Sequence, residues 1–502
     1  MERRAKIMAT LGPASASTEV IGRMLEAGLD VVRLNLSHGD HEEHRTLIRA
    51  VRQLAGELGR FVPIVLDLMG PRYRLGEVAG GSRVLADGQR VRLEAQEGEA
   101  PQTAGAAAGE ASEGSALPIG NPDLLDHLRP GERLLIDNGL VELEIESAGA
   151  VAGGAVSARV VHGGRVSSRK GINLPDTSLP FLISAKDRAD IAFAVEEAVD
   201  YVAASYVNRA DDLEALQAVA TEAGGRLPLI AKLERQGSID RLAELVEAAD
   251  AVMVARGDLG VEVPLYRVPV LQKEIIAAGR DRGKPVIVAT QMLESMMTQP
   301  RPTRAEASDV ANAVLDGADA LMLSGETAAG SFPVGAVAVM ARVIQEAEGF
   351  DRRQRGAGRG SRSFPVFGGD RPRGTSPLSI AEVVSAAAVY AAERLPVQRI
   401  VAFSQGGFTA RMIARNRPEA SILVFTTDPA VARRIQLVWG VRPRLMKAEV
   451  EHHDEVVEVV ERQLLEAGLA KPGEAIVILM GDPIDKRPLT NLMRVHRLAE
   501  AG

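Results

Sequence analysis

The chain has 502 residues, 46% of them hydrophobic and 25% charged, and a formal net charge of −8. This length is too great for one ordinary core, so we expect about two to four domains with the composition of a soluble globular protein. The negative charge argues against broad binding to nucleic acid or a membrane surface, and the absence of cysteine excludes disulfides and thiolate metal sites. The first residues, MERRAKIMATLGPAS, lack the apolar region of a signal peptide, so we expect a cytoplasmic protein.

Eight short apolar runs share one layout, in which β-branched or small apolar residues lead into a polar cluster. They begin at Lys6, Val31, Pro63, Tyr201, Pro228, Ala251, Pro285 and Ala320. Segments with helical periodicity separate most of them, namely Glu19–Leu29, Ala185–Val199, Ser238–Ala249 and Ala305–Asp316. Continuous apolar strands are buried on both faces, as in a parallel sheet. The pattern predicts an α/β fold with a (β/α)8 barrel, whose chemistry lies at the C-terminal ends of the strands.

The third and fourth strands are separated by a long insertion. From Tyr73 to about Arg169 the chain is glycine-rich and strand-like, with runs such as RVRLEA and LVELEIES. This predicts an all-β domain inserted into the barrel, and a position over the catalytic face would make it a lid. Within it, residues 96–115 form a low-complexity patch that we interpret as a disordered loop.

A second change in composition follows the barrel. Residues 351–375 are rich in arginine and glycine, and beyond them helix and strand patterns alternate again from Ser379 to Arg497. A solvated linker is the simpler interpretation of the arginine-rich stretch, with partner or nucleic-acid binding as the alternative. We therefore divide the chain into barrel (1–71), lid (72–169), barrel (170–350), linker (351–375) and C-terminal α/β domain (376–502).

Charged residues close two adjacent strands of the predicted barrel. In IAKLE, Lys232 and Glu234 are two residues apart and share one face of the strand, and Asp258 follows the next strand in ARGDLG. Two carboxylates completed by water or phosphate oxygens are a common way to hold Mg2+. Backbone N–H groups near Gly257 and Asp258, at a helix start, would attract an anion. An internal salt bridge at the barrel mouth is an equal alternative.

Other polar side chains fall at the same expected end of the barrel. Arg33, Asn35 and Ser37 alternate in VVRLNLSHG, and a guanidinium suits a phosphoryl group. Thr290 closes another strand, and Lys170 lies where the insertion returns to the barrel. Each has a simpler alternative. Arg33 could pair with a neighbouring carboxylate, the Thr290 hydroxyl could cap a helix, and Lys170 could be a solvated surface charge.

These motifs, in this order, resemble the pyruvate kinase family. The resemblance is closest in ATLGPAS, VVRLNLSHG, KGINLP, VMVARGDLGVEVP, VATQMLESM and RPTRAEASDVANAVLDGADALMLSGETAAG, and covers nearly the whole chain. It implies the barrel, lid and C-terminal domain described above. It also implies a glycolytic phosphotransferase that moves the phosphoryl group of phosphoenolpyruvate to ADP with Mg2+, or alternatively Mn2+. The family usually forms homotetramers, and neither nucleic acid nor a membrane is an expected partner.

The resemblance assigns roles to matching residues. Lys232 would stabilise the transferring phosphoryl group and the enolate, while Glu234 and Asp258 would hold Mg2+. The substrate carboxylate would lie on N–H groups near Gly257 and Asp258 and on Thr290, which would also help to protonate the enolate carbon through water. The phosphoenolpyruvate phosphate would be held by Arg33. Nucleotide phosphates would be contacted by Asn35, His38, Arg74 and Lys170.

The stretch IVLDLMGPRYRLG departs from the usual family pattern Leu-Asp-Thr-Lys-Gly-Pro-Glu-Ile-Arg. In the family, that aspartate and threonine hold K+ with residues that match Asn35 and Ser37. Here the aspartate is kept as Asp67, but Leu68 replaces the threonine and Arg72 the glutamate. A second family pattern carries leucine and lysine there and works without K+. Because a guanidinium is permanently charged and would repel K+, we hypothesise that Arg72 substitutes for K+. The alternative is that Arg72 pairs with Asp67 and has no effect on the nucleotide.

In the C-terminal domain, FSQGGFTARMIARNRP matches the segment that binds a phosphorylated effector in many relatives. The candidate effector loop consists of Ser404, Gln405, Gly406, Gly407 and Thr409, and it contains no basic residue. The resemblance therefore leaves the identity of any effector open. The sequence also leaves two rival functions open. One is a catalytically idle homologue that senses nucleotide, and the other is a different barrel enzyme acting on phosphoenolpyruvate or pyruvate, such as a Mg2+ aldolase.

Overall fold

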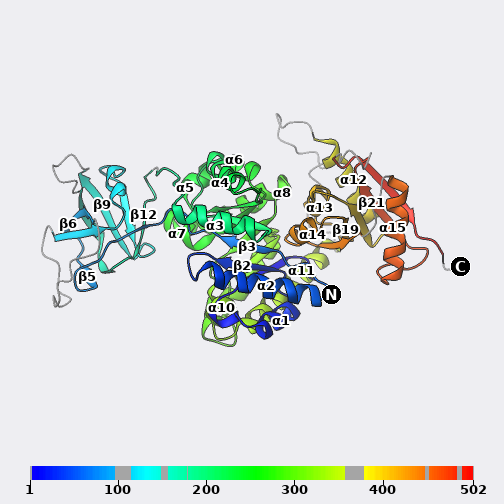
Figure 1. The fold of residues 1–502 in the computed structure, drawn as a ribbon, viewed down its shortest axis with the longest axis horizontal. Helices are drawn as coiled ribbons and strands as arrows, with labels where there is room; N and C mark the ends of the chain where they lie inside the picture. Colours follow the sequence, from blue (N-terminus) through cyan, green and yellow to red (C-terminus); the bar gives the residue numbers. More distant parts are fainter. Residues whose placement is uncertain are drawn as a thin grey trace.

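A closed barrel of eight parallel strands forms the centre of the molecule, and two further domains lie at its opposite ends (Figure 1). The computed structural model describes residues 3–96, 115–147, 156–177, 179–356, 378–446, 452–482 and 489–500. Most of the predicted low-complexity loop and of the arginine-rich linker lies outside the described residues. Among those described, no helix is long and apolar enough to cross a membrane.

The barrel strands are those expected from the eight apolar runs, so the predicted (β/α)8 fold is confirmed. Around the barrel, the strand order is β1-β2-β3-β13-β14-β15-β16-β17, with β17 pairing back to β1. The bounds are β1 (Lys6–Thr10), β2 (Val31–Asn35), β3 (Ile64–Asp67), β13 (Tyr201–Ala204), β14 (Leu229–Leu233), β15 (Ala251–Ala255), β16 (Val286–Ala289) and β17 (Ala320–Leu323).

Helices surround this barrel and bury its outer face. They are α1 (Thr18–Ala27), α2 (His41–Glu57), α3 (Ala185–Glu196), α4 (Ala210–Glu222), α5 (Gln236–Asp240), α6 (Leu242–Ala248), α7 (Arg256–Glu262), α8 (Val268–Asp281), α9 (Arg304–Asp316), α10 (Gly325–Ala328) and α11 (Pro333–Gly356). The helix expected over residues 238–249 is two shorter helices, because Arg241 takes a non-helical conformation with φ −115° and ψ 28°.

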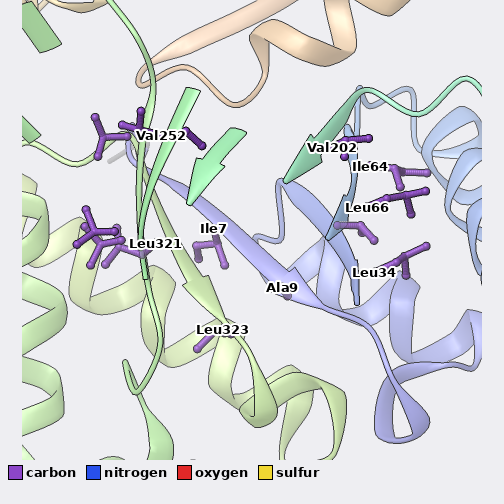
Figure 2. Packing of buried hydrophobic residues seen from close by; sticks show 14 of the residues in the cluster. Ile7, Ala9, Leu34, Ile64, Leu66, Val202, Val252, Leu321 and Leu323 are labelled. Carbon is purple, nitrogen blue, oxygen red and sulfur yellow. The ribbon is translucent and has the colours of Figure 1, made fainter. Parts of the chain in front are cut away.

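Alternate residues of each strand pack outward and inward. Ile7 and Leu34 lie in one buried cluster with the helix residue Met24, and Figure 2 shows several such strand side chains around the barrel wall. Met8, between Ile7 and Ala9, instead belongs to a cluster inside the barrel. Because burying one such side chain stabilises the fold by about 1.5–3 kcal/mol, burial on both faces explains why the strands are apolar throughout.

An aspartate precedes every second barrel strand and joins it to its neighbour. Asp30, Asp200, Asp250 and Asp319 lie directly before β2, β13, β15 and β17. One carboxylate oxygen of each accepts a hydrogen bond from a backbone N–H of the preceding barrel strand, at Ile7 (2.8 Å), Ile64 (2.9 Å), Leu229 (3.0 Å) and Val286 (3.0 Å) respectively. The repeat closes the N-terminal end of the barrel with buried or half-buried polar contacts.

The C-terminal domain docks on three of these four aspartates through their second oxygens. The contacts are Gln436 Nε2 to Asp30 Oδ1 (3.2 Å), Arg433 Nε to Asp200 Oδ1 (2.8 Å) and Arg417 Nη1 to Asp319 Oδ1 (3.0 Å). The domain thus covers the N-terminal ends of the strands and leaves their C-terminal ends open.

The inserted domain forms a seven-stranded sheet in the order β4-β12-β8-β9-β10-β6-β7 and a two-stranded sheet β11-β5. Its strands are β4 (Tyr73–Arg74), β5 (Ser82–Leu85), β6 (Arg90–Ala95), β7 (Ser115–Ile119), β8 (Arg133–Ile136), β9 (Val141–Ser147), β10 (Val156–His162), β11 (Gly164–Ser167) and β12 (Gly171–Asn173). The two connections to the barrel run side by side, because Arg74 of β4 pairs with Gly171 of β12.

The C-terminal domain is a five-stranded sheet in the order β20-β19-β18-β21-β22, of which only β22 is antiparallel to its neighbour. The strands are β18 (Arg399–Phe403), β19 (Ser421–Thr426), β20 (Val441–Leu445), β21 (Ala475–Met480) and β22 (Leu492–Arg497). The helices are α12 (Ile380–Arg394), α13 (Phe408–Ala414), α14 (Pro429–Ile435) and α15 (His453–Glu466).

Candidate active site

A buried cluster of charged side chains lies at the C-terminal ends of neighbouring barrel strands. Lys232 Nζ, on β14, lies 2.8 Å from Glu234 Oε1 and 3.2 Å from Asp67 Oδ1 at the end of β3. It also donates a hydrogen bond of 2.7 Å to Ser205 Oγ, just after β13. The Lys232 side chain is 12% exposed and the two carboxylates at most 2%, so the lysine reaches the barrel mouth while its partners lie beneath it.

Arg33 joins the same cluster from β2. Its Nε lies 2.7 Å from Asp67 Oδ2, and its Nη1 donates to Thr10 Oγ1 at 2.8 Å. The pairing of Arg33 with a neighbouring carboxylate, left open by the sequence, is therefore present. Because Asp67 uses one oxygen for Arg33 and the other for Lys232, it fixes two cations side by side.

The charges in this cluster determine one another's ionisation. Burial opposes the ionised form of Asp67, but Arg33 and Lys232 together outweigh it and hold its pKa below the usual range. Burial also disfavours the charged form of Lys232, yet Asp67 and Glu234 raise its pKa overall. For Glu234, burial is the largest effect and raises the pKa to about 7, with Asp258 acting in the same direction and Lys232 against it. A cation placed beside Glu234 would favour its ionised form.

Glu234 and Asp258 fit a divalent cation. Glu234 Oε2 accepts the backbone N–H of Tyr206 at 2.7 Å, and its buried Oε1 lies 2.8 Å from Lys232 Nζ. Asp258 lies in the first turn of α7 and is half-buried, and its charge acts on Glu234. No group of three or more metal-binding side chains occurs among the described residues. Two carboxylates would leave most positions of an octahedral Mg2+ to water and substrate oxygens.

Thr290 lies beside the start of α7. Its hydroxyl accepts the backbone N–H of Gly257 at 2.8 Å and donates to Ala289 O at 2.6 Å. A Cβ at position 257 would lie 3.4 Å from Thr290 Oγ1, an ordinary van der Waals contact, so the two residues are close neighbours. The structure thus brings together the residues predicted to hold the substrate carboxylate.

The predicted nucleotide residues fall into two groups. Arg74 and Lys170 are neighbours at the connections of the inserted domain, where Arg74 Nη1 donates to Arg169 O (3.0 Å) and Lys170 Nζ lies 2.8 Å from Asp137 Oδ2. Asn35 and His38 lie at the end of β2 on the barrel. The Asn35 side chain accepts the N–H of Ser37 at 3.1 Å, and His38 is exposed.

Arg72 does not lie against Asp67 as a simple ion pair would require. Arg72 is exposed, and among the described residues it forms no ion pair with Asp67, whose oxygens lie against Arg33 and Lys232. Burial raises the pKa of Tyr206, and the charge of Arg72 is one of those that oppose this shift. Leu68 is buried and has no side-chain oxygen for a cation, while its carbonyl accepts from Ser205 Oγ at 2.8 Å.

The candidate effector loop lies far from this cluster, in the C-terminal domain. Ser404 is buried after β18, and Gln405 and Gly406 connect it to Gly407, which precedes α13 with φ 76°. Thr409 Oγ1 lies 2.7 Å from Thr490 Oγ1 and is buried, so that hydroxyl has a partner within the fold.

Three contributors were missed from the sequence: Thr10, Ser205 and Arg256. Thr10 and Ser205 each follow an apolar strand run, so their position at a predicted strand end was an available signal. Arg256 lies within ARGDLG, but its side chain bonds to Ala289 O, Thr290 O and Asp309, which are distant in sequence.

Comparisons with known proteins agree along the whole chain. The family model "Pyruvate kinase, barrel domain" matches residues 2–337, and "Pyruvate kinase, alpha/beta domain" matches residues 382–496. The chain is 42% identical over 501 residues to a pyruvate kinase of Mycobacterium tuberculosis, covering 100% of this chain and 99% of that one. It is 39% identical over 504 residues to a pyruvate kinase of Geobacillus stearothermophilus, covering 81% of that protein. The crystal structure of a Cryptosporidium parvum pyruvate kinase superposes with a TM-score of 0.84 at 31% identity, covering 99% of this chain and 96% of that one.

Proposed function

The chain belongs to the pyruvate kinase family, and we propose that its barrel mouth transfers the phosphoryl group of phosphoenolpyruvate to ADP in a Mg2+-dependent step of glycolysis. The observation that carries this proposal is the cluster of Lys232, Arg33 and Asp67 beside Glu234, at the C-terminal end of the barrel. The two cations lie where a TIM barrel carries its chemistry.

Phosphoryl transfer requires positive charge held in a fixed position, and this cluster provides it. The bond from phosphorus to the enol oxygen breaks while a bond to a terminal ADP oxygen forms, and negative charge develops on the enolate. Such reactions depend on positioning and charge neutralisation. Lys232 stays protonated between two carboxylates, so it offers a fixed positive charge to the phosphoryl group and the enolate oxygen. Arg33 offers a second charge, held in place by Asp67 and Thr10.

The remaining steps fall to groups around this pair. The enolate carbon takes a proton to give pyruvate, and the Thr290 hydroxyl would pass that proton through a water molecule. N–H groups near Gly257 and Asp258 would hold the substrate carboxylate at the start of α7. Glu234 and Asp258 would hold the divalent cation. When bound, Mg2+ or Mn2+ supplies positive charge to the phosphate and enolate oxygens.

We also propose that the inserted domain is a lid whose connections contact the nucleotide. Arg74 and Lys170 lie at the two adjacent connections. Asn35 and His38 would contact the nucleotide phosphates from the end of β2 on the barrel. Closure of the lid would exclude water and so prevent hydrolysis of the transferring group.

For monovalent cations, we propose that Arg72 makes K+ unnecessary. Two observations support this: Leu68 offers no side-chain oxygen, and both oxygens of Asp67 already contact protein cations. Turnover should then be nearly equal with K+ and with a bulky organic cation at the same ionic strength. A double variant, Leu68→Thr with Arg72→Glu, restores the usual family residues and should become dependent on K+. An absolute K+ requirement in the unmodified protein would refute the role of Arg72.

A homotetramer is the assembly that we propose, supported by two exposed apolar surfaces. On the barrel, Leu265, Tyr266 and Val270 are 74%, 82% and 55% exposed. On the C-terminal domain, α12 exposes Ile380 and the edge strand β22 exposes Val495. Light scattering should give four chains, and Tyr266→Asp should give a smaller species while a control, Leu140→Asp on the inserted domain, should not.

The reaction itself is tested by a coupled assay for pyruvate formed from phosphoenolpyruvate and ADP. We expect turnover that depends on ADP and on Mg2+. Formation of pyruvate without ADP would indicate a different reaction, and nucleotide binding without any product would favour a catalytically idle homologue.

A further inference from the structure

The backbone at the end of β16 has an unusual conformation. Thr290 and Gln291 are consecutive non-glycine residues with φ of 70° and 53°. This left-handed region is sparsely occupied by side-chain-bearing residues, and a β-branched residue such as threonine is rare there. Conformations of this kind persist only where neighbouring groups hold them, and they concentrate at functional sites.

The group that holds this turn is the guanidinium of Arg256, from the neighbouring strand end. Its Nε donates to Ala289 O at 3.3 Å and its Nη2 to Thr290 O at 2.8 Å. Its Nη1 donates to Asp309 Oδ1 at 2.7 Å on α9, and the side chain is only 14% exposed. One planar group therefore fixes two successive carbonyls and is itself fixed by a carboxylate.

The turn determines where the Thr290 hydroxyl lies. In the left-handed conformation, Thr290 Oγ1 accepts from Gly257 N, the N–H directly after Arg256. Three consecutive residues thus act together. Arg256 restrains Thr290, Gly257 supplies the N–H that contacts its hydroxyl, and Asp258 is one of the two carboxylates proposed to hold the metal. An extended Thr290 would direct its side chain elsewhere and break this contact.

We propose that Arg256 is a positioning residue that holds Thr290 in its left-handed conformation and so sets the hydroxyl for proton delivery to the enolate carbon. This inference rests on the proposed function, in which Thr290 carries that role. Lysine could keep the charge and the pairing with Asp309, but a point charge cannot span both carbonyls as the planar guanidinium does.

The test compares Arg256→Lys with the control Arg52→Lys. Arg52 is also half-buried and paired to an aspartate, but it lies at the opposite end of the barrel. We expect Arg256→Lys to lower kcat about 10-fold or more with little change in KM for phosphoenolpyruvate. Exchange of the pyruvate methyl hydrogens with D2O, followed by NMR, should fall by a similar factor, because the protonation step runs in reverse through the same groups. Arg52→Lys should leave both rates unchanged.

A rescue experiment separates positioning from general loss of structure. Glycine adopts positive φ without steric cost, so Gln291→Gly lowers the cost of the left-handed turn at one of its two residues. In the Arg256→Lys background it should restore part of kcat and of the exchange rate. Gln291→Ala in the same background should not. If Arg256→Lys fails to fold, Asp309→Asn can replace it, because it removes the carboxylate that holds the guanidinium and so disturbs Arg256 less. Its kcat should fall by a smaller factor, and Gln291→Gly should recover part of that loss.

Two results would overturn the inference: unchanged kcat and exchange in Arg256→Lys, or a loss that Gln291→Gly fails to reverse. Failure of the proposed function looks different, because the unmodified protein would then form no pyruvate from phosphoenolpyruvate and ADP.

Discussion

Replacing Asp200 by asparagine tests how the C-terminal domain is held on the barrel. Asp200 is 1% exposed and contacts two guanidiniums, Arg52 at 2.8 Å and Arg433 at 2.8 Å, the second from the C-terminal domain. Asparagine can still accept the N–H of Ile64, so the change removes charge and leaves that hydrogen bond available. Asp250 has the same place in the barrel repeat and accepts the N–H of Leu229, but it is exposed, so Asp250→Asn is the matched control.

The expected magnitude follows from these contacts. Breaking a buried ion pair from one side costs about 3–5 kcal/mol. Arg52 and Arg433 are 27% and 23% exposed and keep part of their hydration, so we expect about 2 kcal/mol for Asp200→Asn and under about 1 kcal/mol for Asp250→Asn. In calorimetry, a loss of about 2 kcal/mol lowers the Tm for cooperative unfolding of the whole chain by roughly 2 °C. Limited proteolysis should also release the C-terminal domain faster in Asp200→Asn alone. Equal effects of the two variants would refute docking through the second carboxylate oxygen.

Two further predictions concern ligands. Because burial raises the pKa of Glu234 to about 7, protons should compete with Mg2+ below that pH. The apparent Kd for Mg2+ should therefore rise about tenfold per pH unit as pH falls, which Mg2+ titrations at pH 6 and pH 8 check. The Glu234→Ala variant should need far more Mg2+ at both pH values. An unchanged response to Mg2+ in Glu234→Ala would remove Glu234 from the metal site. Arg74→Ala should raise KM for ADP about 10-fold or more while KM for phosphoenolpyruvate stays constant, whereas equal changes in both would place Arg74 outside the nucleotide site.

Much of the fold was predictable because local sequence and global burial agree. Each barrel strand is a continuous apolar run ended by polar residues, and Lys232 and Glu234 could be placed on one strand face from their spacing alone. The break between α5 and α6 was missed because Arg241 is compatible with a helix and only its backbone angles interrupt the pattern.

The contacts inside the site depend on strand register, which a single sequence does not specify. The sequence placed Arg33, Asp67 and Lys232 at the barrel mouth, but the two-sided pairing of Asp67 follows from pairings such as Asn35 with Asp67 and Ala203 with Asp67. The left-handed Thr290 opposes its own local preference, so no propensity argument could predict it. The guanidinium that bonds to its carbonyl belongs to Arg256, 34 residues earlier in the chain.

The most direct test of the account is phosphoryl transfer by Lys232→Met, compared with Lys284→Met. Lys284 donates to the carbonyls of Glu247 and Ala249, away from the charged cluster, and so controls for loss of a half-buried lysine. With circular dichroism showing intact folds, single-turnover measurement should give a transfer rate at least about 100-fold lower for Lys232→Met and near the unmodified value for Lys284→Met. Full turnover by Lys232→Met would contradict the central claim that this lysine neutralises the charge that develops during transfer.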